Sequence, residues 1–173
     1  VINIQAKIVL NAAGPFVDQI RKINDKTASS LLQVRAGTHL ILGSEFSPPA
    51  TGILIPKASD GRIIFTLPWY NRTLVGTTDI SSLVTSNPLP SEQEISYLLK
   101  NLKDYLNIAA EKKDIESVWS GLRPLILQEK KLKLKKKTSK FISRDYSISV
   151  DHSQLITIAG GKWTTYRAMA VKA

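Results

Sequence analysis

The segment Leu155–Arg167, LITIAGGKWTTYR, says more about fold and function than any other part of the chain. Its opening residues are mostly apolar and predict a buried strand, and Gly160 and Gly161 allow a sharp turn into a helix that begins near Thr164. Where a strand leads through a glycine turn into a helix, the unpaired N–H groups and the positive end of the helix dipole point to one place. Lys162 adds a full positive charge there. The segment therefore predicts a site for an anion, a phosphate or a cofactor atom that becomes negative during a reaction.

Length and composition limit the possible classes of protein. With 173 residues, 43% of them hydrophobic, the chain is large enough for one domain with a sizeable core. It contains no cysteine, which excludes disulfides and thiolate metal sites, and its two histidines, His39 and His152, are too few for a usual zinc site. No apolar run reaches the roughly 18 residues of a transmembrane helix. The opening residues, Val1–Ile4, show no signal or transit peptide.

The net charge of +10 is concentrated in one stretch of the chain. Lysines this close together repel one another, which predicts a solvated loop at about residues 128–140. No aromatic residue alternates with the lysines to stack on bases, so nucleic acid is not an expected partner, whereas contact with an anionic membrane surface remains an alternative. The lysines are Lys130, Lys131, Lys133, Lys135, Lys136, Lys137 and Lys140.

Hydrophobic patterns and turn residues predict an α+β fold, mainly antiparallel or mixed β-sheet with flanking helices. One helix is expected from Pro15 to about residue 23, and another from Ser91 to Leu106, where Ser91 and Glu94 form a capping box. Turns at residues 60–61 and 70–71 predict an antiparallel meander. The predicted strands cover residues 7–10 (a short buried strand), 38–42, 52–56, 62–69, 72–77, 116–127, 141–150 and 155–159.

Eight short motifs occur along the chain in a fixed order: NAAGP (11–15), GTH (37–39), SDGR (59–62), LPW (67–69), GTTD (76–79), WSGLRP (119–124), ISRD (142–145) and GGKWTTYR (160–167). Together they closely resemble the FAD-dependent glycerol-3-phosphate dehydrogenases, the respiratory quinone-linked enzymes. The resemblance covers nearly the whole chain apart from the lysine-rich stretch. Each motif alone is weak, and the specificity lies in the ordered set.

The resemblance implies a flavoenzyme that oxidises sn-glycerol 3-phosphate to dihydroxyacetone phosphate and passes electrons through FAD to a membrane ubiquinone. It implies the substrate (cap) domain of a glutathione-reductase-type FAD oxidoreductase, at residues 25–154, with segments of the FAD-binding domain at residues 1–24 and 155–173. The implied location is the mitochondrial inner membrane, or the bacterial cytoplasmic membrane for a prokaryotic source. Two alternatives stay open: a glycerol-3-phosphate oxidase that uses oxygen, and a non-catalytic basic module that binds anions or membranes.

The resemblance also implies roles for single residues. Arg123 matches an arginine that contacts the substrate phosphate, a task suited to a planar guanidinium. Lys162 matches a substrate-side lysine beside the flavin, and Thr165 is expected to contact substrate with these two. His39 matches an active-site histidine that removes or orients the hydroxyl proton, so Arg123, Lys162 and His39 form the expected catalytic set. The expected FAD-binding residues are Asn11, Ala13, Gly14, Pro15, Gly160, Gly161, Lys162, Trp163 and Thr164.

Other readings apply where the resemblance is set aside. Arg123 then becomes a surface ion pair and His39 a structural histidine. For Arg144 and Arg167, structural ion pairs are favoured over a role in the site. None of the nine glycines lies in a G-x-G-x-x-G pattern, the turn that holds a dinucleotide pyrophosphate. We therefore expect this chain, taken alone, to be inactive and to bind FAD weakly or not at all.

Overall fold

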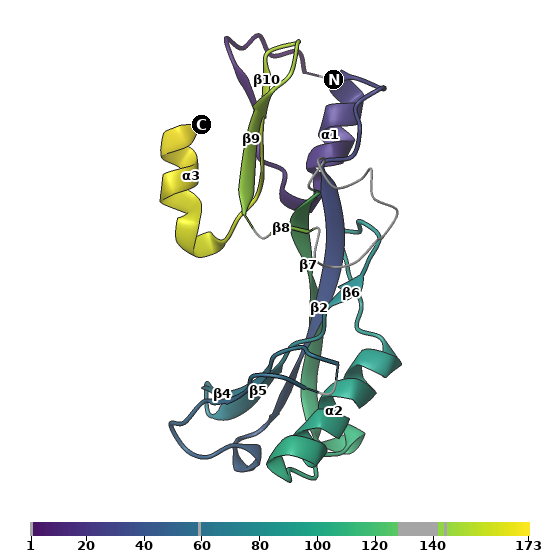
Figure 1. The fold of residues 1–173 in the computed structure, drawn as a ribbon, viewed down its shortest axis with the longest axis vertical. Coiled ribbons are helices and arrows are strands. Elements are labelled where there is room, and N and C mark those ends of the chain that lie inside the picture. The colour runs from purple at the N-terminus through teal and green to yellow at the C-terminus, as the bar shows by residue number, and fades with distance from the viewer. Residues whose placement is uncertain (1, 59, 128–141, 144) are drawn as a thin grey trace. The chain divides into compact units, whose positions relative to one another are not determined.

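The computed structural model describes residues 2–58, 60–127, 142–143 and 145–173. These residues form two compact units (Figure 1): unit 1 comprises Val1–Val34 and Arg123–Ala173, and unit 2 comprises Arg35–Leu122. The boundaries fall inside two long strands, β2 (Leu32–Gly43) and β7 (Ile115–Leu127). The predicted lysine-rich loop lies outside the described residues, as do Ser59, Phe141 and Arg144.

The larger sheet contains the predicted antiparallel meander. Strands β3 (Ile53–Ile55), β4 (Ile64–Trp69) and β5 (Arg72–Gly76) pair in sequence order, and β5 pairs with β2. The full order is β3-β4-β5-β2-β7-β8, with β8 at Ile142–Ser143 and β6 (Ile80–Ser81) paired to β2. Both predicted turns are confirmed, because the backbone takes a positive φ at Gly61 in one turn and at Tyr70 and Asn71 in the other.

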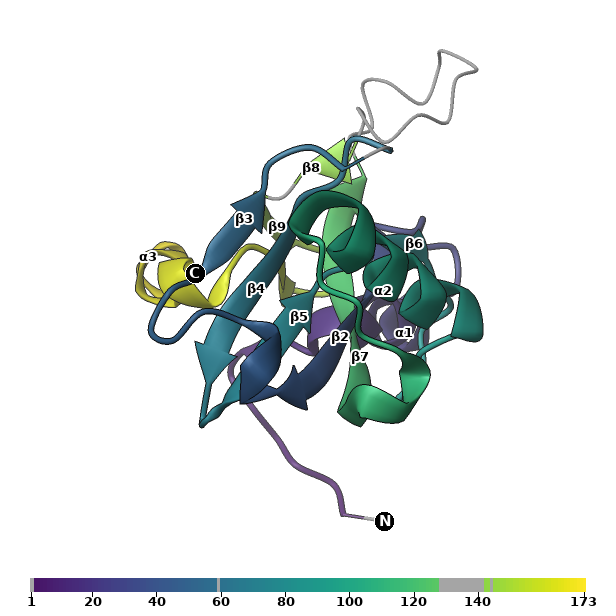
Figure 2. The ribbon, with the colours of Figure 1, turned by 90° about the horizontal axis from the view of Figure 1, so that it is seen from below.

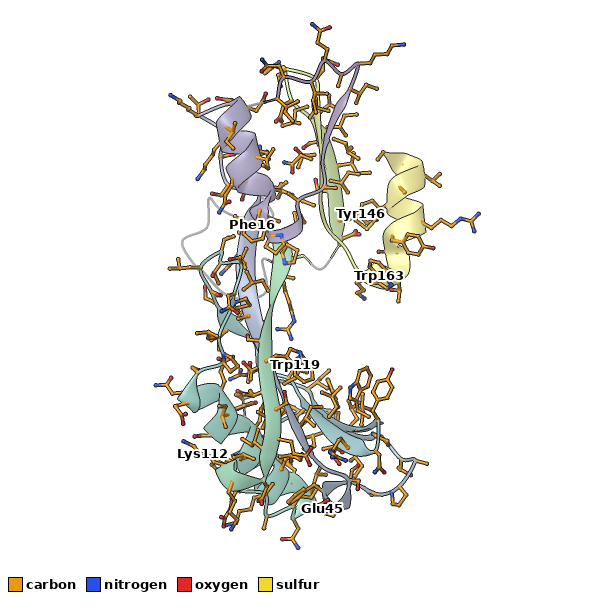
Figure 3. All side chains as sticks on the ribbon, turned by 180° about the vertical axis from the view of Figure 1, so that it is seen from behind. Phe16, Glu45, Lys112, Trp119, Tyr146 and Trp163 are labelled. Atoms are coloured by element: carbon orange, nitrogen blue, oxygen red, sulfur yellow. The ribbon has the colours of Figure 1, made fainter. Side chains whose placement is uncertain are left out.

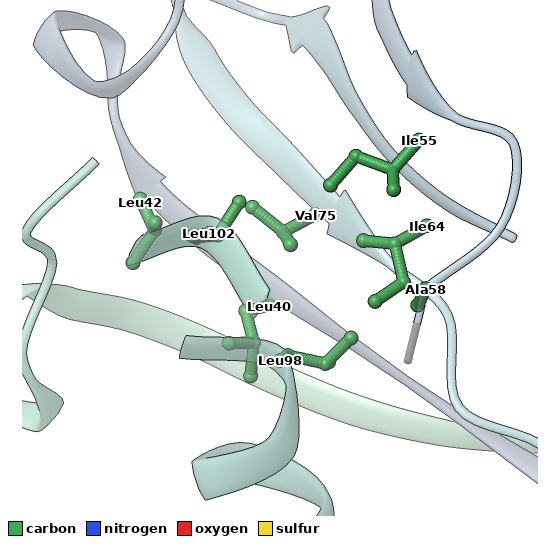
Figure 4. Packing of buried hydrophobic residues seen from close by; sticks show 8 residues of the cluster. All are labelled: Leu40, Leu42, Ile55, Ala58, Ile64, Val75, Leu98 and Leu102. Carbon is green, nitrogen blue, oxygen red and sulfur yellow. The ribbon is translucent and has the colours of Figure 1, made fainter. Parts of the chain in front are cut away.

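Helix α2 (Glu92–Leu106) packs on one face of this sheet in unit 2 (Figure 2) and confirms the predicted capping box. The Ser91 hydroxyl accepts the Glu94 N–H, and the Glu94 side chain accepts the Ser91 N–H. Leu98 and Leu102, four residues apart, lie on the sheet side of the helix and are fully buried. Burying a leucine stabilises a fold by about 1.5–3 kcal/mol. Figure 4 shows the resulting core: Leu40, Leu42, Ile55, Ala58, Ile64, Val75, Leu98 and Leu102.

Unit 1 contains a three-stranded sheet of order β1-β10-β9. Strand β10 (Leu155–Gly160) is antiparallel to β9 (Tyr146–Val150) and parallel to β1 (Val9–Asn11). The predicted buried strand at 155–159 and its antiparallel pairing are confirmed, since buried and half-buried side chains alternate along β10. Each of the parallel strands leads into a 3₁₀ turn and a helix: η1 (Gly14–Phe16) with α1 (Val17–Asn24), and η6 (Trp163–Thr165) with α3 (Tyr166–Lys172).

Several predicted boundaries need correction. The first strand occupies Val9–Asn11 rather than residues 7–10, and it is not buried, because Val9 and Leu10 are 56% and 52% exposed. Strand β2 begins six residues before the predicted start at residue 38, and the alternation of apolar and polar residues from Leu32 to Ala36 is a strand pattern that the prediction overlooked. The predicted strand 141–150 is divided between β8 and β9. The last helix follows the 3₁₀ turn η6 and begins at Tyr166.

Unit 2 also contains two short 3₁₀ turns, η2 (Ser44–Phe46) and η3 (Lys112–Asp114). Across the residues that the structure describes, no helix is both long enough and apolar enough to cross a membrane.

Candidate functional site

In unit 2 the sheet face opposite α2 carries a row of apolar and aromatic side chains. Paired strand residues share a face, and the pairs His39–Gly76, Phe65–Gly76 and Leu54–Phe65 alternate with core pairs such as Leu40–Val75. We call this surface the open face. It consists of His39, Ile41, Leu54, Phe65, Leu67, Trp69, Leu74, Gly76 and Trp119.

His39 lies within the open face and is held by aromatic rings on two sides. The Trp119 ring stacks on the imidazole with centroids 5.6 Å apart and an interplanar angle of 18°. The Phe65 ring is tilted against it at 6.0 Å. Trp119, labelled on β7 in Figure 3, is 40% exposed, whereas His39 is half-buried. The structure thus places the predicted histidine in an aromatic cage on a sheet face that no helix of unit 2 covers among its described residues.

Gly76 makes room for the imidazole. A Cβ atom at this position would lie 2.4 Å from Cδ2 and 2.9 Å from Nε2 of His39, and 2.8 Å from Cζ of Phe65. Real Cβ atoms essentially never approach other atoms this closely. The ring therefore rests directly against the glycine backbone, and the next peptide bond, Gly76–Thr77, is cis.

A buried hydrogen-bond network lies behind His39 and joins α2 to both neighbouring strand segments. Glu94 Oε1 accepts from the hydroxyls of Thr38 at 2.9 Å and Thr78 at 2.5 Å. Thr78 Oγ1 in turn accepts the Thr38 N–H at 2.8 Å. The second carboxylate oxygen accepts from the N–H and the hydroxyl of Ser91 at 3.0 and 2.9 Å. Glu94 is only 4% exposed, so the carboxylate is satisfied by protein groups.

The network also fixes the protonation of Glu94. Burial alone would raise the pKa of Glu94, but the hydrogen bonds from Thr78, Ser91 and Thr38 to the charged form outweigh it and hold the pKa below its ordinary value. The residue is therefore an ionised carboxylate that only accepts hydrogen bonds near neutral pH.

In unit 1 the two parallel strands end at glycine turns on the same edge of their sheet. Asn11, at the end of β1, pairs in register with Thr157 of β10, and the following turns contain Gly14, Gly160 and Gly161. All three glycines have positive φ, of 56°, 74° and 78°. In open α/β sheets, ligands bind outside the carboxyl ends of parallel strands, and the carboxyl ends of β1 and β10 lie at this edge.

The predicted cofactor residues around Gly14 have distinct roles in the structure. Asn11 is buried, and its amide donates to the carbonyl of Val17 at 3.0 Å and to Thr157 Oγ1 at 3.5 Å. Its own Oδ1 accepts the Ala13 N–H at 3.4 Å. Pro15 occupies the start of the 3₁₀ turn, as predicted. A Cβ at Gly14 would meet no atom within 4 Å, so the backbone there borders open space.

The second turn carries Lys162 and Thr165. The Gly161 N–H donates to the Asp145 carbonyl at 3.1 Å, which fixes the turn against the start of β9. Thr165 Oγ1 accepts the Lys162 N–H at 3.2 Å and donates to the Lys162 carbonyl at 2.9 Å, so this hydroxyl closes the 3₁₀ turn. The Lys162 side chain is exposed. The turn thus carries an exposed cation directly after two glycines of positive φ.

Aromatic side chains flank this turn. Trp163 is 88% exposed and stacks on Tyr166 with centroids 5.8 Å apart. Figure 3 labels Tyr146 between β9 and α3, where the Lys172 ammonium lies 5.6 Å from its ring centroid. Arg123, the predicted phosphate ligand, is half-buried on β7 and belongs to unit 1 with Lys162 and Thr165, whereas His39 belongs to unit 2.

A hollow of about 600 Å³ opens elsewhere in unit 2, between η2 with its following loop and the end of α2. Its walls include Phe46, Pro48, Pro49, Leu106 and Ile108, and none of the predicted site residues. Within the described part of the chain, no group of three or more His, Cys, Asp or Glu side chains could hold a metal ion.

Sequence reasoning missed the groups that hold His39: Phe65, Trp119 as a stacking partner, Gly76 and the Glu94 network. The ring contacts join strands that are distant in sequence, so no local signal reveals them. Glu94 could have been found, because it precedes Leu98 and Leu102 by one and two helical turns and therefore lies on the buried side of α2.

A family model described as "FAD dependent oxidoreductase" matches residues 1–167. The chain is 45% identical over 168 residues to a mitochondrial glycerol-3-phosphate dehydrogenase of Arabidopsis thaliana and 44% identical over 170 residues to the mitochondrial glycerol-3-phosphate dehydrogenase of Homo sapiens. Each alignment covers 97% of this chain, and 26% and 23% of the relatives. The chain thus spans about a quarter of the length of the curated relatives it matches.

Solved structures give a consistent result. The glycerol-3-phosphate dehydrogenase from Bacillus halodurans, complexed with FAD, superposes with a TM-score of 0.80 at 33% identity, over 98% of this chain and 31% of that one. The L-α-glycerophosphate oxidase from Mycoplasma pneumoniae, with FAD bound, superposes with a TM-score of 0.66 at 16% identity, over 95% and 40% of the two chains. At that identity the second likeness concerns the fold alone.

Proposed function

We propose, because this chain belongs to the family of FAD-dependent oxidoreductases, that the protein containing it is a glycerol-3-phosphate dehydrogenase. Its reaction would be the oxidation of sn-glycerol 3-phosphate to dihydroxyacetone phosphate, with FAD as cofactor and a membrane quinone as electron acceptor. The observation that carries the proposal is the 44–45% identity, over 97% of the chain, to relatives named glycerol-3-phosphate dehydrogenase. The aromatic cage around His39 and the cationic turn at Lys162 supply groups that this chemistry needs.

We assign FAD to the edge of unit 1 where β1 and β10 end, and the backbone there supports the assignment. Gly14 leaves open space beside the backbone, and Gly160 and Gly161 take the left-handed conformation that allows a tight turn at this edge. Bound FAD supplies the acceptor for the hydride that leaves the substrate carbon. The residues assigned to hold it are Asn11, Ala13, Gly14, Pro15, Gly160, Gly161, Lys162, Trp163 and Thr164.

The substrate is assigned to side chains with complementary chemistry. Arg123 and Lys162 bind the phosphate dianion, Arg123 through its planar fork of donors and Lys162 as a point charge. Thr165 keeps the Lys162 backbone in place through the two hydrogen bonds described above. His39 orients the substrate hydroxyl or accepts its proton during oxidation. Unit 2 then corresponds to a substrate (cap) domain, and unit 1 to a part of the FAD-binding domain.

The decisive experiment is an anaerobic titration of the purified full-length protein with glycerol 3-phosphate. Loss of the visible absorbance of oxidised flavin is the expected result, and glycerol without phosphate should cause none. Arg123→Lys should raise KM at least tenfold, because a lysine cannot reproduce the bidentate fork. The matched control is Arg62→Lys, at an arginine that pairs with Asp60 in a turn of unit 2. A flavin that stays oxidised with excess substrate would refute the proposal.

The electron acceptor is tested in the same preparation. Once reduced by glycerol 3-phosphate, the flavin should be reoxidised rapidly by a water-soluble ubiquinone analogue and slowly by oxygen. Rapid reoxidation by oxygen with stoichiometric hydrogen peroxide would instead identify an oxidase. If the flavin is not reduced but the protein binds anionic vesicles in a salt-dependent way, a non-catalytic binding module is the better description.

We further propose a mitochondrial location, since the relatives at 44–45% identity are named mitochondrial, and within the organelle the inner membrane, where a quinone acceptor would be available. Fractionation of cells that express the tagged full-length protein tests this. Recovery of the activity with washed inner membranes is expected, and recovery in the cytosolic supernatant would contradict the assignment.

A further inference from the structure

Glu94 is an unusual residue for the core of unit 2. It is 4% exposed and sits on the buried side of α2, next to the leucines that pack on the sheet. Removing a carboxylate from water is costly, and apolar residues often replace buried charged groups without loss of stability. One oxygen of Glu94 serves the capping box of α2, whereas the other, Oε1, binds two threonine hydroxyls of the sheet, a contact that helix capping does not require.

The partners of Glu94 lie immediately beside His39. Thr38 precedes His39 on β2, and Thr78 follows two residues after Gly76, the register partner of His39 on β5. Glu94 Oε1 binds both hydroxyls, and Thr38 and Thr78 are further joined by the bond from the Thr38 N–H to Thr78 Oγ1. One carboxylate oxygen thus connects the two backbone segments between which the imidazole is placed.

The position of the His39 ring depends closely on this connection. The ring rests against the Gly76 backbone, where even a Cβ would come within 2.4 Å, and against the rings of Trp119 and Phe65. A shift of β2 relative to the end of β5 would either press the imidazole into Gly76 or draw it out of its stack. Thr38 and Thr78 are both fully buried, so no water can substitute for the carboxylate without rearrangement.

We propose that Glu94 is a positioning residue for His39, acting through the Thr38 and Thr78 hydroxyls to fix the two segments that hold the imidazole. The inference rests on the proposed function, because it assigns Glu94 to the same site. The carboxylate approaches from the helix side of the sheet and the histidine faces the open side, so Glu94 influences the reaction without touching substrate.

The test uses Thr78→Val and Thr78→Ser in the full-length protein. Valine keeps the shape of the side chain but removes the hydroxyl that binds Glu94, whereas serine retains it. Because a misplacement of about 1 Å costs roughly 100-fold in rate, Thr78→Val should lower kcat by 10- to 100-fold with little change in KM, and Thr78→Ser should recover most of it. Glu94→Gln should show a loss of the same kind, because its single acceptor oxygen can serve either the threonine hydroxyls or Ser91 but not both.

A matched control separates positioning from stability. Leu98→Ala removes a fully buried side chain one turn further along α2, costs about 2–5 kcal/mol by creating a cavity, and leaves the network untouched. At a temperature where each variant remains folded, Leu98→Ala should keep the wild-type kcat. Equal losses of kcat in Leu98→Ala and Thr78→Val, or a wild-type kcat in Thr78→Val, would overturn the proposal.

Hydrogen exchange gives a second measurement that needs no turnover. Amides of residues 36–42 and 72–78 should exchange faster in Thr78→Val than in Thr78→Ser, and unchanged exchange would also overturn the proposal. The activity of a His39→Gln variant tests the proposed function separately. If His39→Gln keeps full activity while exchange accelerates in Thr78→Val, the catalytic assignment of His39 is wrong and the structural connection stands. If neither variant differs from wild type, both are wrong.

Discussion

Adding a single methyl group at Gly76 would displace His39 from its cage. In Gly76→Ala the new Cβ would lie 2.4 Å from His39 Cδ2 and 2.8 Å from Phe65 Cζ, whereas ordinary van der Waals contacts begin at 3.4 Å. To restore an ordinary contact of 3.4 Å, the imidazole and the backbone at Gly76 must separate by 1.0 Å, the difference between 3.4 and 2.4 Å. The φ angle of Gly76 is not in the positive range, so the strain arises from these contacts.

The cost of this change can be stated for stability and for activity. Overpacking of this kind typically destabilises a protein by about 1–3 kcal/mol. A shift of about 1 Å in a catalytic group lowers activity by roughly 100-fold. We therefore expect Gly76→Ala to unfold at a lower urea concentration and to lose about two orders of magnitude in kcat/KM for glycerol 3-phosphate, measured with an artificial quinone acceptor.

The matched control is Gly52→Ala. There the new Cβ would meet Leu67 Cδ2 at 2.7 Å, the far end of a flexible side chain that can turn aside. A double-mutant cycle with His39→Ala then isolates the clash, because Gly76→Ala should cost less stability once the imidazole is gone. Gly76→Ala with wild-type stability and activity, or with the same penalty in the His39→Ala background, would refute this account of the cage.

Three further predictions concern groups whose ionisation or burial the structure defines. The pKa of Glu94 is lower in the folded than in the unfolded protein, so the carboxylate stabilises the fold above its ordinary pKa of 4.5 and this contribution is lost as the pH falls through the folded value. Urea unfolding of Glu94→Gln should thus differ most from wild type near neutral pH and converge with it in acid; a pH-independent difference would contradict this. Burial and the hydrogen bond donated to Asp60 raise the pKa of Tyr97 to about 12, so the stability from this contact is complete below pH 10 and is lost as the pH rises toward 12. In Tyr97→Phe, the free energy of unfolding should fall less steeply between pH 10 and pH 12. The phenol that ionises near pH 12 in the wild-type protein should be missing from the spectrophotometric titration of this variant. Asn11→Leu should cost about 1 kcal/mol in thermal unfolding, because it removes the buried hydrogen bonds that the Asn11 amide donates to the Val17 carbonyl and to Thr157 Oγ1; an unchanged melting temperature would show that these bonds do not stabilise the fold.

The local elements were predictable from the sequence because their signals lie within a few residues. The capping box of Ser91 and Glu94 and the spacing of Leu98 and Leu102 locate α2. Asp60–Gly61 locates a hairpin turn because a glycine there can take positive φ. For these elements, the local sequence preference and the tertiary packing favour the same backbone conformation.

The pairing of distant segments could not be predicted in this way. The parallel register of β1 with β10 and the aromatic contacts of His39 join residues with no local signal for one another. The resemblance to a family identified His39 as a candidate, but only the structure shows the rings and the glycine around it. The apolar run that suggested a buried first strand is instead largely exposed among the described residues, since apolar composition alone does not show what covers a strand.

The division of the chain into units has a consequence for its synthesis. Unit 2 is one continuous segment, whereas unit 1 is assembled from segments on either side of it. The hydrogen bond from Asn11 to Thr157 spans 146 residues, and at about 5–20 residues per second the ribosome needs roughly 7–30 s to make the intervening chain. During that interval the β2–β5 meander and α2 can already fold, while β1 has emerged without its parallel partner. Because its apolar side chains and strand edge are then uncovered, we expect β1 to bind chaperones that recognise extended hydrophobic segments until β10 has been made.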